Sequence, residues 1–283
     1  PKVGRINLTY ALTEAGTTRT EYTIIREAED RFVLISAGAW HAYDRDFLLK
    51  AVADKQEAFG RIEVEDWTTR IGVFALAGPK SRDVLAEVIR DADPETALSN
   101  KRFPWLSAKK IELGMCPLTA VRVAYTGELG WELHHPMEMQ TYLWDLLLAA
   151  GEKHGLVLAG ARAQNWLRQE KSYRAFGTEL GRDATPLEAG LDRFVDGKEA
   201  MVKTGIRSRC VTLLVDGPAD ADPWGREALY DGDEKVGRLT SGGYSVVFGK
   251  SIAMGYVRPD LAAPGTKLKV RMFRDLFDVE VVE

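Results

Sequence analysis

The fold of this chain is decided by the stretch Tyr125-Thr126-Gly127-Glu128-Leu129-Gly130-Trp131-Glu132. Residues 121–125 alternate in polarity at its start, which predicts a strand that Tyr125 closes. A turn containing Gly127 follows and places Glu132 on the next predicted strand. The stretch therefore predicts two strands joined by a turn, with an aromatic ring on one side of the turn and a carboxylate on the other.

Tyr125 and Glu132 together suit a flat heterocycle that has a polar edge. An aromatic face offers stacking, and a carboxylate accepts the two parallel N–H donors of a 2-amino-4-oxo pyrimidine edge such as that of a pterin. The alternative is that Tyr125 and Trp131 are core aromatics and that Glu132 is an acid on a solvated strand face. Residue types alone favour this alternative, because single acids on strands are common.

Composition argues against several classes of protein. The 283 residues suffice for two or three domains, and the hydrophobic (45%) and charged (28%) fractions are those of an ordinary globular protein. A net charge of −4 gives no sign of a nucleic-acid partner. The longest apolar runs, such as residues 146–150, are far too short to span a bilayer, so no membrane partner is expected. Two cysteines indicate a reducing compartment, either the cytoplasm or, in a eukaryote, the mitochondrial matrix.

Hydrophobic periodicity predicts a mixed region of helices and strands at the start of the chain. A hairpin is predicted from strands at 6–12 and 21–26, on either side of a polar turn at 13–16. The other predicted elements of this region are a strand at 32–36, a helix at 43–59 that Gly60 ends, a strand at 73–77, a helix from Pro79 to about Ile89, and helices at 137–153 and 161–174.

After Leu191 the sequence changes to short β-rich pieces separated by turn signals. The signals are Asp231-Gly232, Ser241-Gly242-Gly243 and Ala263-Pro264-Gly265. Evenly spaced short strands predict a small barrel or sandwich. We therefore place a first region at 1–195 and a β-barrel-like domain at 196–283.

The predicted helix at 161–174 is rich in polar side chains. Asn165 and Arg168 are surface neighbours at this spacing, and Arg168 can fork onto a carbonyl or carboxylate of a ligand. The alternative is an intrahelical network such as Glu170 with Arg174, four positions apart. The spacing of the residues alone supports these two alternatives equally.

Two further acids are candidates for contact with a ligand. Glu21 shares a predicted strand with Tyr22, and its carboxylate can orient a ligand amine, or exchange a proton with it, if burial raises its pKa. The alternative, an exposed acid that pairs with Arg19, is the commoner arrangement. Glu188 follows a proline within residues 185–191, a segment that can bring backbone close to a ligand but is a weak signal by itself.

Other kinds of site find no support in the sequence. His134 and His135 are adjacent on a predicted strand and point to opposite faces, so we expect no metal site there or elsewhere. No G-x-G-x-x-G follows a predicted strand, and no P-loop motif occurs. No nucleophile elbow supports a serine hydrolase.

Five segments, in order along the chain, resemble the glycine-cleavage T-protein (aminomethyltransferase) superfamily. They are Leu76-Ala77-Gly78-Pro79-Lys80-Ser81-Arg82, the stretch from Tyr125 to Glu132, Gly160-Ala161-Arg162 with Leu167-Arg168-Gln169-Glu170, residues 185–191, and Leu239-Thr240-Ser241-Gly242-Gly243-Tyr244-Ser245. Within the superfamily the chain looks most like the dimethylglycine and sarcosine dehydrogenase branch. The residues that carry this resemblance are 5–12 together with 20–23, Leu129 and Trp131, and residues 170–177.

In that branch an FAD domain precedes a tetrahydrofolate-binding region. The flavin oxidises an N-methyl amine, and folate captures the one-carbon unit as 5,10-methylenetetrahydrofolate. The resemblance therefore implies tetrahydrofolate as cofactor and a methylated amine, or another one-carbon donor, as small-molecule partner. It implies FAD only if a further N-terminal domain exists.

The resemblance also implies an α+β fold in which three subdomains surround a central folate pocket, with the β-barrel-like domain at the C-terminal end. It carries Tyr125 and Glu132 over as pterin contacts and Arg168 as a folate contact. We include Tyr22 and Glu188 among the cofactor-binding residues.

The catalytic Asp of the family falls, by alignment, at Thr20 or Glu21. Glu21 would then replace it with a side chain one methylene longer. A folate amine that attacks an iminium or formaldehyde needs positioning more than a strong base, and a Glu can provide that.

Two departures from the family pattern stand out. The family's segment before the first strand and any FAD domain are absent, and the connection between Val195 and Gly197 is shorter than usual. We therefore expect the chain to be part of something longer.

Together these observations predict the folate-dependent one-carbon transfer region of a dimethylglycine/sarcosine dehydrogenase-like demethylating enzyme. One alternative is a stand-alone folate-dependent aminomethyltransferase or demethylase that takes its one-carbon unit from another donor. A second alternative is a non-catalytic folate-binding regulatory module.

Overall fold

The structure is a computed structural model that describes residues 1–195, 201, 205–218 and 221–282. The chain divides into two compact units. Unit 1 consists of Pro1–Thr9, Tyr22–Ala124 and Glu128–Leu158, and unit 2 consists of Tyr10–Glu21, Tyr125–Gly127 and Ala159–Glu283. The expected short connection between Val195 and Gly197 lies outside the described residues, and the domain boundary at residue 195 stays a prediction.

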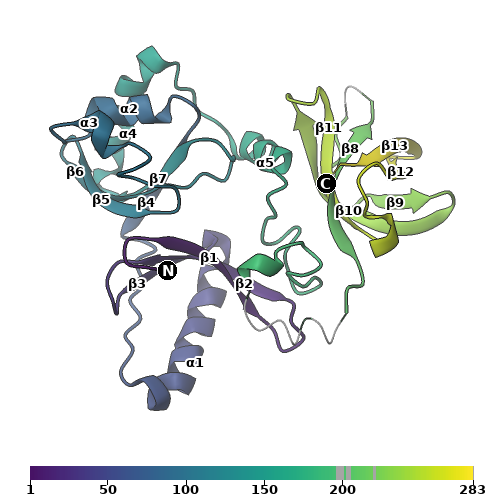
Figure 1. Cartoon of the computed structure of the whole chain (residues 1–283), viewed down its shortest axis with the longest axis horizontal. Coiled ribbons are helices and arrows are strands. Elements are labelled where there is room, and N and C mark those ends of the chain that lie inside the picture. The colour runs from purple at the N-terminus through teal and green to yellow at the C-terminus, as the bar shows by residue number, and fades with distance from the viewer. Residues whose placement is uncertain (196–200, 202–204, 219–220, 283) are drawn as a thin grey trace. The chain divides into compact units, whose positions relative to one another are not determined.

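Unit 1 is built on a four-stranded antiparallel sheet with the strand order β4-β7-β6-β5. Its strands are β4 (Ile71–Ala77), β5 (Ala108–Leu113), β6 (Cys116–Val121) and β7 (Gly130–Pro136). Helices α2 (Ser81–Val88) and α4 (Gln140–Gly151) cover one face of this sheet, as Figure 1 shows. Leu85, Trp131 and Leu143 are fully buried in the core between the sheet and the helices.

Strand β7 shows why the two faces of this sheet differ. Successive side chains of a strand point to opposite faces, so their burial alternates. Trp131 and Leu133 are buried in the core with the helices, whereas Glu132 and His134 are half-buried on the other face. His135 returns to the buried face, which confirms that the two adjacent histidines point in opposite directions.

The N-terminal strands form a second, three-stranded sheet in which β2 is central. They are β1 (Ile6–Leu12), β2 (Thr18–Arg26) and β3 (Phe32–Ile35). The predicted hairpin is confirmed, but β2 begins three residues earlier than the predicted start at residue 21. The turn is tight because the Thr13 N–H donates to the Thr17 carbonyl at 2.9 Å, and Gly16 supplies the φ of 78° that such a turn requires.

Helix α1 (His41–Phe59) follows the 3-10 turn η1 (Gly38–Trp40) and ends at Gly60, as predicted. Gly60 has a φ of 76°, a conformation that glycine adopts without strain and that terminates a helix. The predicted helix at 137–153 is α4 flanked by two 3-10 turns. The short helices of unit 1 are α3 (Pro94–Ala97), η2 (Met137–Met139) and η3 (Glu152–His154).

Unit 2 contains a closed antiparallel barrel with the strand order β10-β11-β8-β13-β12-β9, visible in Figure 1. Its strands are β8 (Arg209–Asp216), β9 (Ala228–Asp231), β10 (Glu234–Ser245), β11 (Lys250–Val257), β12 (Lys267–Met272) and β13 (Asp275–Val281). Leu213, Leu229 and Val270 are fully buried in its core. The predicted C-terminal β-barrel-like domain is therefore confirmed.

Helix α5 (Ala161–Glu170) lies against β10 within unit 2. A glycine makes this approach possible, because a Cβ added at Gly243 would meet the Trp166 ring at 2.0 Å. The described part of this unit also contains the 3-10 turns η4 (Asp192–Phe194) and η5 (Pro259–Leu261). Among the described residues, no helix is both long and apolar enough to cross a bilayer.

The strand predicted at 121–125 is wrong. The strand in this region is β6, which ends at Val121, and Tyr125 lies in the turn that precedes β7. The register explains the difference, because β6 pairs with β5 from Cys116 onward and the chain leaves the sheet after Val121.

Two further boundary predictions are corrected. The helix predicted at 161–174 ends at Glu170, because Ser172 has a φ of 54°, which a right-handed helix does not allow. The turn predicted at residues 241–243 lies inside β10 instead. Its glycines leave room for close neighbours, since a Cβ at Gly242 would meet the Pro223 carbonyl oxygen at 2.3 Å.

Candidate functional site

A cluster of aromatic and charged side chains in unit 2 contains two of the predicted site residues. Its members are Tyr10 from β1, Glu21 from β2, Tyr125 from the turn before β7, and Arg174 from the segment after α5. All four belong to unit 2. Burial raises the pKa of Tyr10, and the neighbouring Glu21 raises it further. The fold thus gathers groups from four separate parts of the sequence.

Tyr125 is held through its hydroxyl and its ring. The hydroxyl donates to the Arg174 carbonyl oxygen at 3.1 Å, and the ring stacks on Tyr173 with centroids 6.2 Å apart and planes 27° apart. The residue is still 36% exposed, so part of the ring is open to a ligand. Burial raises the pKa of Tyr125 above its usual value, which keeps the hydroxyl protonated at neutral pH.

Glu21 is half-buried, unlike the exposed acid of the alternative that pairs it with Arg19. Burial raises the pKa of Glu21 to about 7, and a side-chain hydrogen bond with Tyr10 opposes part of that rise. A carboxyl group that titrates near neutrality can orient an amine and exchange a proton with it at physiological pH. This arrangement supports the predicted catalytic role, which stays a prediction.

Glu132 and Tyr22 belong to unit 1. The Glu132 carboxylate lies 3.2 Å from His134 Nε2, and this contact occupies one of the about four lone-pair positions of the carboxylate. The Glu132 side chain is 31% exposed. The Tyr22 ring, by contrast, is buried. Because Tyr125 belongs to unit 2, the joint contact of Tyr125 and Glu132 with one ligand stays a prediction.

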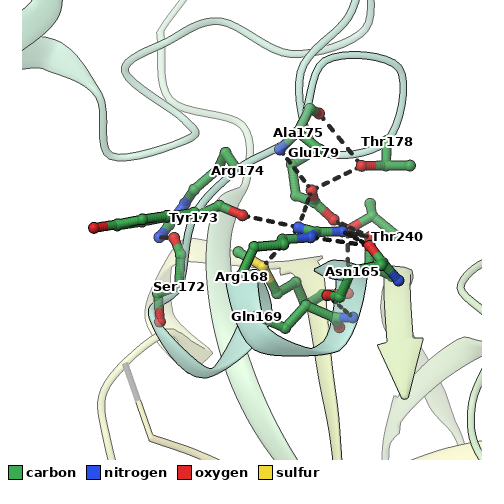
Figure 2. Close-up of polar contacts among 12 residues, drawn as sticks. Asn165, Arg168, Gln169, Ser172, Tyr173, Arg174, Ala175, Thr178, Glu179 and Thr240 are labelled. Carbon is green, nitrogen blue, oxygen red and sulfur yellow. Dashed lines mark hydrogen bonds and ion pairs between the residues drawn. The ribbon is translucent and has the colours of Figure 1, made fainter. Parts of the chain in front are cut away.

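Arg168 is 1% exposed and lies at the centre of the polar network in Figure 2. Its Nη1 donates to Glu179 Oε2 at 2.7 Å and to the Tyr173 carbonyl oxygen at 2.9 Å. Its Nε and Nη2 donate to Asn165 Oδ1 at 3.0 and 2.9 Å, and Nη2 also donates to Ser241 Oγ. The predicted proximity of Asn165 and Arg168 is confirmed, and every guanidinium nitrogen has a partner in the protein.

Glu179, which the sequence analysis missed, neutralises Arg168. Its carboxylate accepts hydrogen bonds from Thr240 Oγ1 at 2.7 Å, from the Ala175 N–H at 3.0 Å and from Ser241 Oγ at 2.5 Å. Burial acts to raise the pKa of Glu179, but the Arg168 charge and these hydrogen bonds outweigh it and hold the pKa below its usual value. Arg168 lies on α5 and Glu179 in the loop that follows, so no helical or strand period relates the two and no sequence signal marked this pair.

Glu188 is fully buried and forms a capping box with Thr185. Its carboxylate accepts from the Thr185 N–H at 2.9 Å, and its own N–H donates to Thr185 Oγ1 at 3.2 Å. Arg207 Nε and Nη2 each donate to a different carboxylate oxygen of Glu188 at 3.0 Å. The carboxylate is thus engaged by the protein itself, and a contact with folate stays a prediction.

Metal ligands do not cluster in the part of the chain that the structure describes: it holds no group of three or more His, Cys, Asp or Glu side chains that could bind an ion. Cys116 and Cys210 are both free and buried. Burial raises the pKa of the Cys210 thiol to about 12, so this thiol is a poor nucleophile at neutral pH.

Two family models match the chain. The GCVT N-terminal domain matches residues 1–199, and the glycine cleavage T-protein C-terminal barrel domain matches residues 208–283. The second range coincides with the closed barrel of unit 2, which begins at β8.

Curated relatives of three kinds are similar to the chain. Mitochondrial dimethylglycine dehydrogenase of Homo sapiens is 34% identical over 297 residues, which cover 100% of this chain and 33% of the relative. Mitochondrial sarcosine dehydrogenase of Mus musculus is 31% identical, over 90% of this chain and 29% of the relative. A probable aminomethyltransferase of Thermococcus kodakarensis is 29% identical, over 93% of this chain and 72% of the relative. The chain therefore spans about a third of the length of the dehydrogenases it matches.

A solved structure has the same fold. The crystal structure of glycine cleavage system aminomethyltransferase T from Bartonella henselae matches with a TM-score of 0.82 at 23% identity, over 100% of this chain and 76% of that chain. The predicted α+β fold with a C-terminal barrel is thereby confirmed. With both family models matched in order along the chain, the chain belongs to the glycine cleavage T-protein (aminomethyltransferase) family.

Proposed function

We propose that this chain binds tetrahydrofolate and transfers a one-carbon unit to it, as the folate-dependent region of an enzyme that demethylates an N-methyl amine. The observation that carries the proposal is the half-buried Glu21, which titrates near neutrality and lies in one cluster with the partly exposed ring of Tyr125. The similarity of the whole chain to dimethylglycine dehydrogenase supports the choice of branch.

The side chains present fit a reduced pterin. Tyr125 offers part of a neutral aromatic face for stacking, and its ring orientation is fixed by the hydroxyl contact with Arg174. Glu132 offers a partly exposed carboxylate with lone pairs left for two parallel N–H donors, a match that orients the ring as well as binding it. Arg168, Glu188 and Tyr22 are buried, so Tyr125 and Glu132 are the two residues on which the binding proposal rests.

Glu21 supplies the proton chemistry of this proposal. Tetrahydrofolate, when bound, brings a nucleophilic amine that carries the one-carbon unit. The Glu21 carboxylate orients that amine and accepts a proton from its nitrogen, since a group whose pKa is about 7 is present in both protonation states at neutral pH. Its half-buried position limits competing exchange with bulk water.

The partner chemistry follows from the branch. The small-molecule partner is a methylated amine or another one-carbon donor, and FAD would be bound by a domain outside these 283 residues. The mitochondrial dehydrogenases among the relatives support a reducing compartment, the mitochondrial matrix in a eukaryote or the cytoplasm otherwise.

A second candidate is a stand-alone folate-dependent aminomethyltransferase or demethylase. It is favoured by the 29% identity to the probable aminomethyltransferase of Thermococcus kodakarensis over 93% of this chain. A regulatory module that binds folate without catalysis would bind tetrahydrofolate but show no turnover that depends on Glu21.

An anaerobic calorimetric titration with tetrahydrofolate tests the proposal. We expect saturable binding to the unchanged chain and a loss of affinity on the order of 100-fold in Glu132→Ala, because two charge-assisted hydrogen bonds are lost. Glu112→Ala is the matched control, since Glu112 lies on β5 of the same sheet and is exposed. Absence of saturable binding to the unchanged chain would contradict the proposed function, and full affinity in Glu132→Ala would remove Glu132 from it.

The branch is tested separately on the intact protein. An absorbance spectrum with flavin bands that bleach on addition of dimethylglycine or sarcosine supports the dehydrogenase branch. Folate binding without a flavin spectrum supports the stand-alone enzyme.

A further inference from the structure

The segment that follows α5 is held at two points, one on each side of Arg174. On one side, Arg168 Nη1 donates to the Tyr173 carbonyl oxygen at 2.9 Å. On the other side, Glu179 Oε2 accepts from the Ala175 N–H at 3.0 Å. Arg168 and Glu179 are joined to each other at 2.7 Å. One ion pair therefore restrains the backbone both before and after Arg174, as the dashed lines of Figure 2 show.

The ion pair is itself fixed to the barrel. Glu179 Oε1 accepts from Thr240 Oγ1 at 2.7 Å and from Ser241 Oγ at 2.5 Å, both on β10. The Glu179 carbonyl oxygen accepts from the Tyr256 hydroxyl on β11 at 2.7 Å. The Arg168 and Glu179 side chains are only 1% and 0% exposed, and buried polar groups that satisfy one another in this way form a rigid network.

Tyr125 contacts both of the residues that the ion pair restrains. Its ring stacks on the Tyr173 ring, and its hydroxyl donates to the Arg174 carbonyl oxygen at 3.1 Å. Tyr125 lies in a turn, so no strand ladder holds its backbone at this point. All of these residues belong to unit 2. The contacts run without a break from the barrel, through the ion pair, to the Tyr125 ring.

We propose that the Arg168–Glu179 ion pair positions Tyr125: by holding Tyr173 and Arg174 in place against the barrel, it orients the Tyr125 ring for stacking on the pterin. This inference rests on the proposed function, in which Tyr125 stacks on bound folate. It gives Arg168 a role at the site without contact with the ligand, because each guanidinium nitrogen already has a partner in the protein.

The direct test observes the Tyr125 ring in the ligand-free chain. In protein labelled with 3-fluorotyrosine, the nine tyrosines give nine ¹⁹F signals, and the Tyr125 signal is assigned from its loss in Tyr125→Phe. The double variant Arg168→Met/Glu179→Leu removes both anchors and leaves no unpaired buried charge. We expect the Tyr125 signal to move toward the shift of free 3-fluorotyrosine. The Tyr230 signal, from β9, should stay in place and so report that the barrel is folded.

A milder variant covers the case in which the first does not fold. Arg168→Met/Glu179→Gln keeps an amide oxygen for the Ala175 N–H and for the hydroxyl groups of β10, so it removes only the anchor at Tyr173. We expect a smaller shift of the Tyr125 signal in the same direction. A Tyr125 signal that keeps its place in a folded variant contradicts the proposal.

A double-mutant cycle with tetrahydrofolate separates positioning from direct contact. Arg168→Met/Glu179→Leu should weaken binding about tenfold, the upper end of what an aromatic stack contributes, and should weaken it no further when Tyr125 is already alanine. A direct contact of Arg168 with folate, or a general loosening of the unit, would weaken binding by the same factor in both backgrounds. The control Lys269→Met/Asp278→Leu removes an exposed ion pair of the barrel and should leave the affinity unchanged.

The outcomes separate the two proposals. An unmoved Tyr125 signal, or an equal loss of affinity in both Tyr125 backgrounds, overturns the positioning role and leaves the proposed function intact. Absence of tetrahydrofolate binding by the unchanged chain overturns the proposed function, whereas the fluorine spectra still decide whether the ion pair holds the Tyr125 ring.

Discussion

At the scale of single residues, Glu21 links the candidate chemistry to stability. Its folded-state pKa is raised from 4.5 to about 7, so the folded carboxyl group binds its proton more tightly than the unfolded one. Below pH 4.5 both states are protonated and burial of the acid costs nothing. Between pH 4.5 and 7 the unfolded state loses its proton first, so the free energy of unfolding falls as the pH rises, and above pH 7 the whole cost is present.

Glu21→Gln is therefore expected to stabilise the chain at alkaline pH. The neutral isostere has no charge to bury, so urea unfolding should give equal stability below pH 4.5 and a gain of about 3 kcal/mol at pH 8. Glu14→Gln, in the exposed part of the hairpin turn, is the matched control and should show no such trend. A constant difference between Glu21→Gln and the unchanged chain across pH 4 to 8 would show that Glu21 is not a strained buried acid.

At the scale of elements, the contact between α5 and β10 depends on one glycine. A Cβ at Gly243 would lie 2.0 Å from the Trp166 ring, so Gly243→Ala must move either the indole or the strand. We expect a loss of about 1–3 kcal/mol in the free energy of unfolding, measured by urea denaturation. Gly38→Ala, where the added Cβ meets nothing within 4 Å, should change stability little. An unchanged stability in Gly243→Ala would mean that Trp166 has an alternative place to pack.

At the scale of the whole molecule, the two units have separate hydrophobic cores. Leu143 belongs to the core of unit 1 and Leu213 to the barrel core of unit 2, and both are fully buried. A Leu→Ala change in such a core costs about 2–5 kcal/mol, which should speed amide exchange through the opening of that core by at least roughly 30-fold.

Hydrogen–deuterium exchange followed by mass spectrometry checks this expectation. Leu143→Ala should accelerate exchange in β4 and β7 while the barrel strands keep their rates, and Leu213→Ala should do the reverse. Leu49→Ala on α1, at an exposed leucine, serves as the control. Equal acceleration of both units by either variant would show that the chain opens as one cooperative body.

Much of the architecture is predictable because its signals are local. The alternation that ends at Pro136 predicts β7 and the opposite orientation of its two histidines, and Gly60 predicts the end of α1. The short β-rich pieces after Leu191 predict a barrel or a sandwich, and the structure has a closed barrel. One prediction fails where a local signal meets a tertiary contact: Gly243 resembles a turn residue but makes room for Trp166.

By itself the sequence determined the α+β architecture, the order of family segments, and the choice of Tyr125, Glu132 and Glu21 as candidates. Only the tertiary structure decided that burial raises the pKa of Glu21 to about 7 and that Glu179 neutralises Arg168. The physical reason is the distance along the chain over which each effect acts. Hydrophobic periodicity joins residues two to four positions apart, whereas desolvation and charge pairing depend on groups that folding brings together from distant parts of the chain.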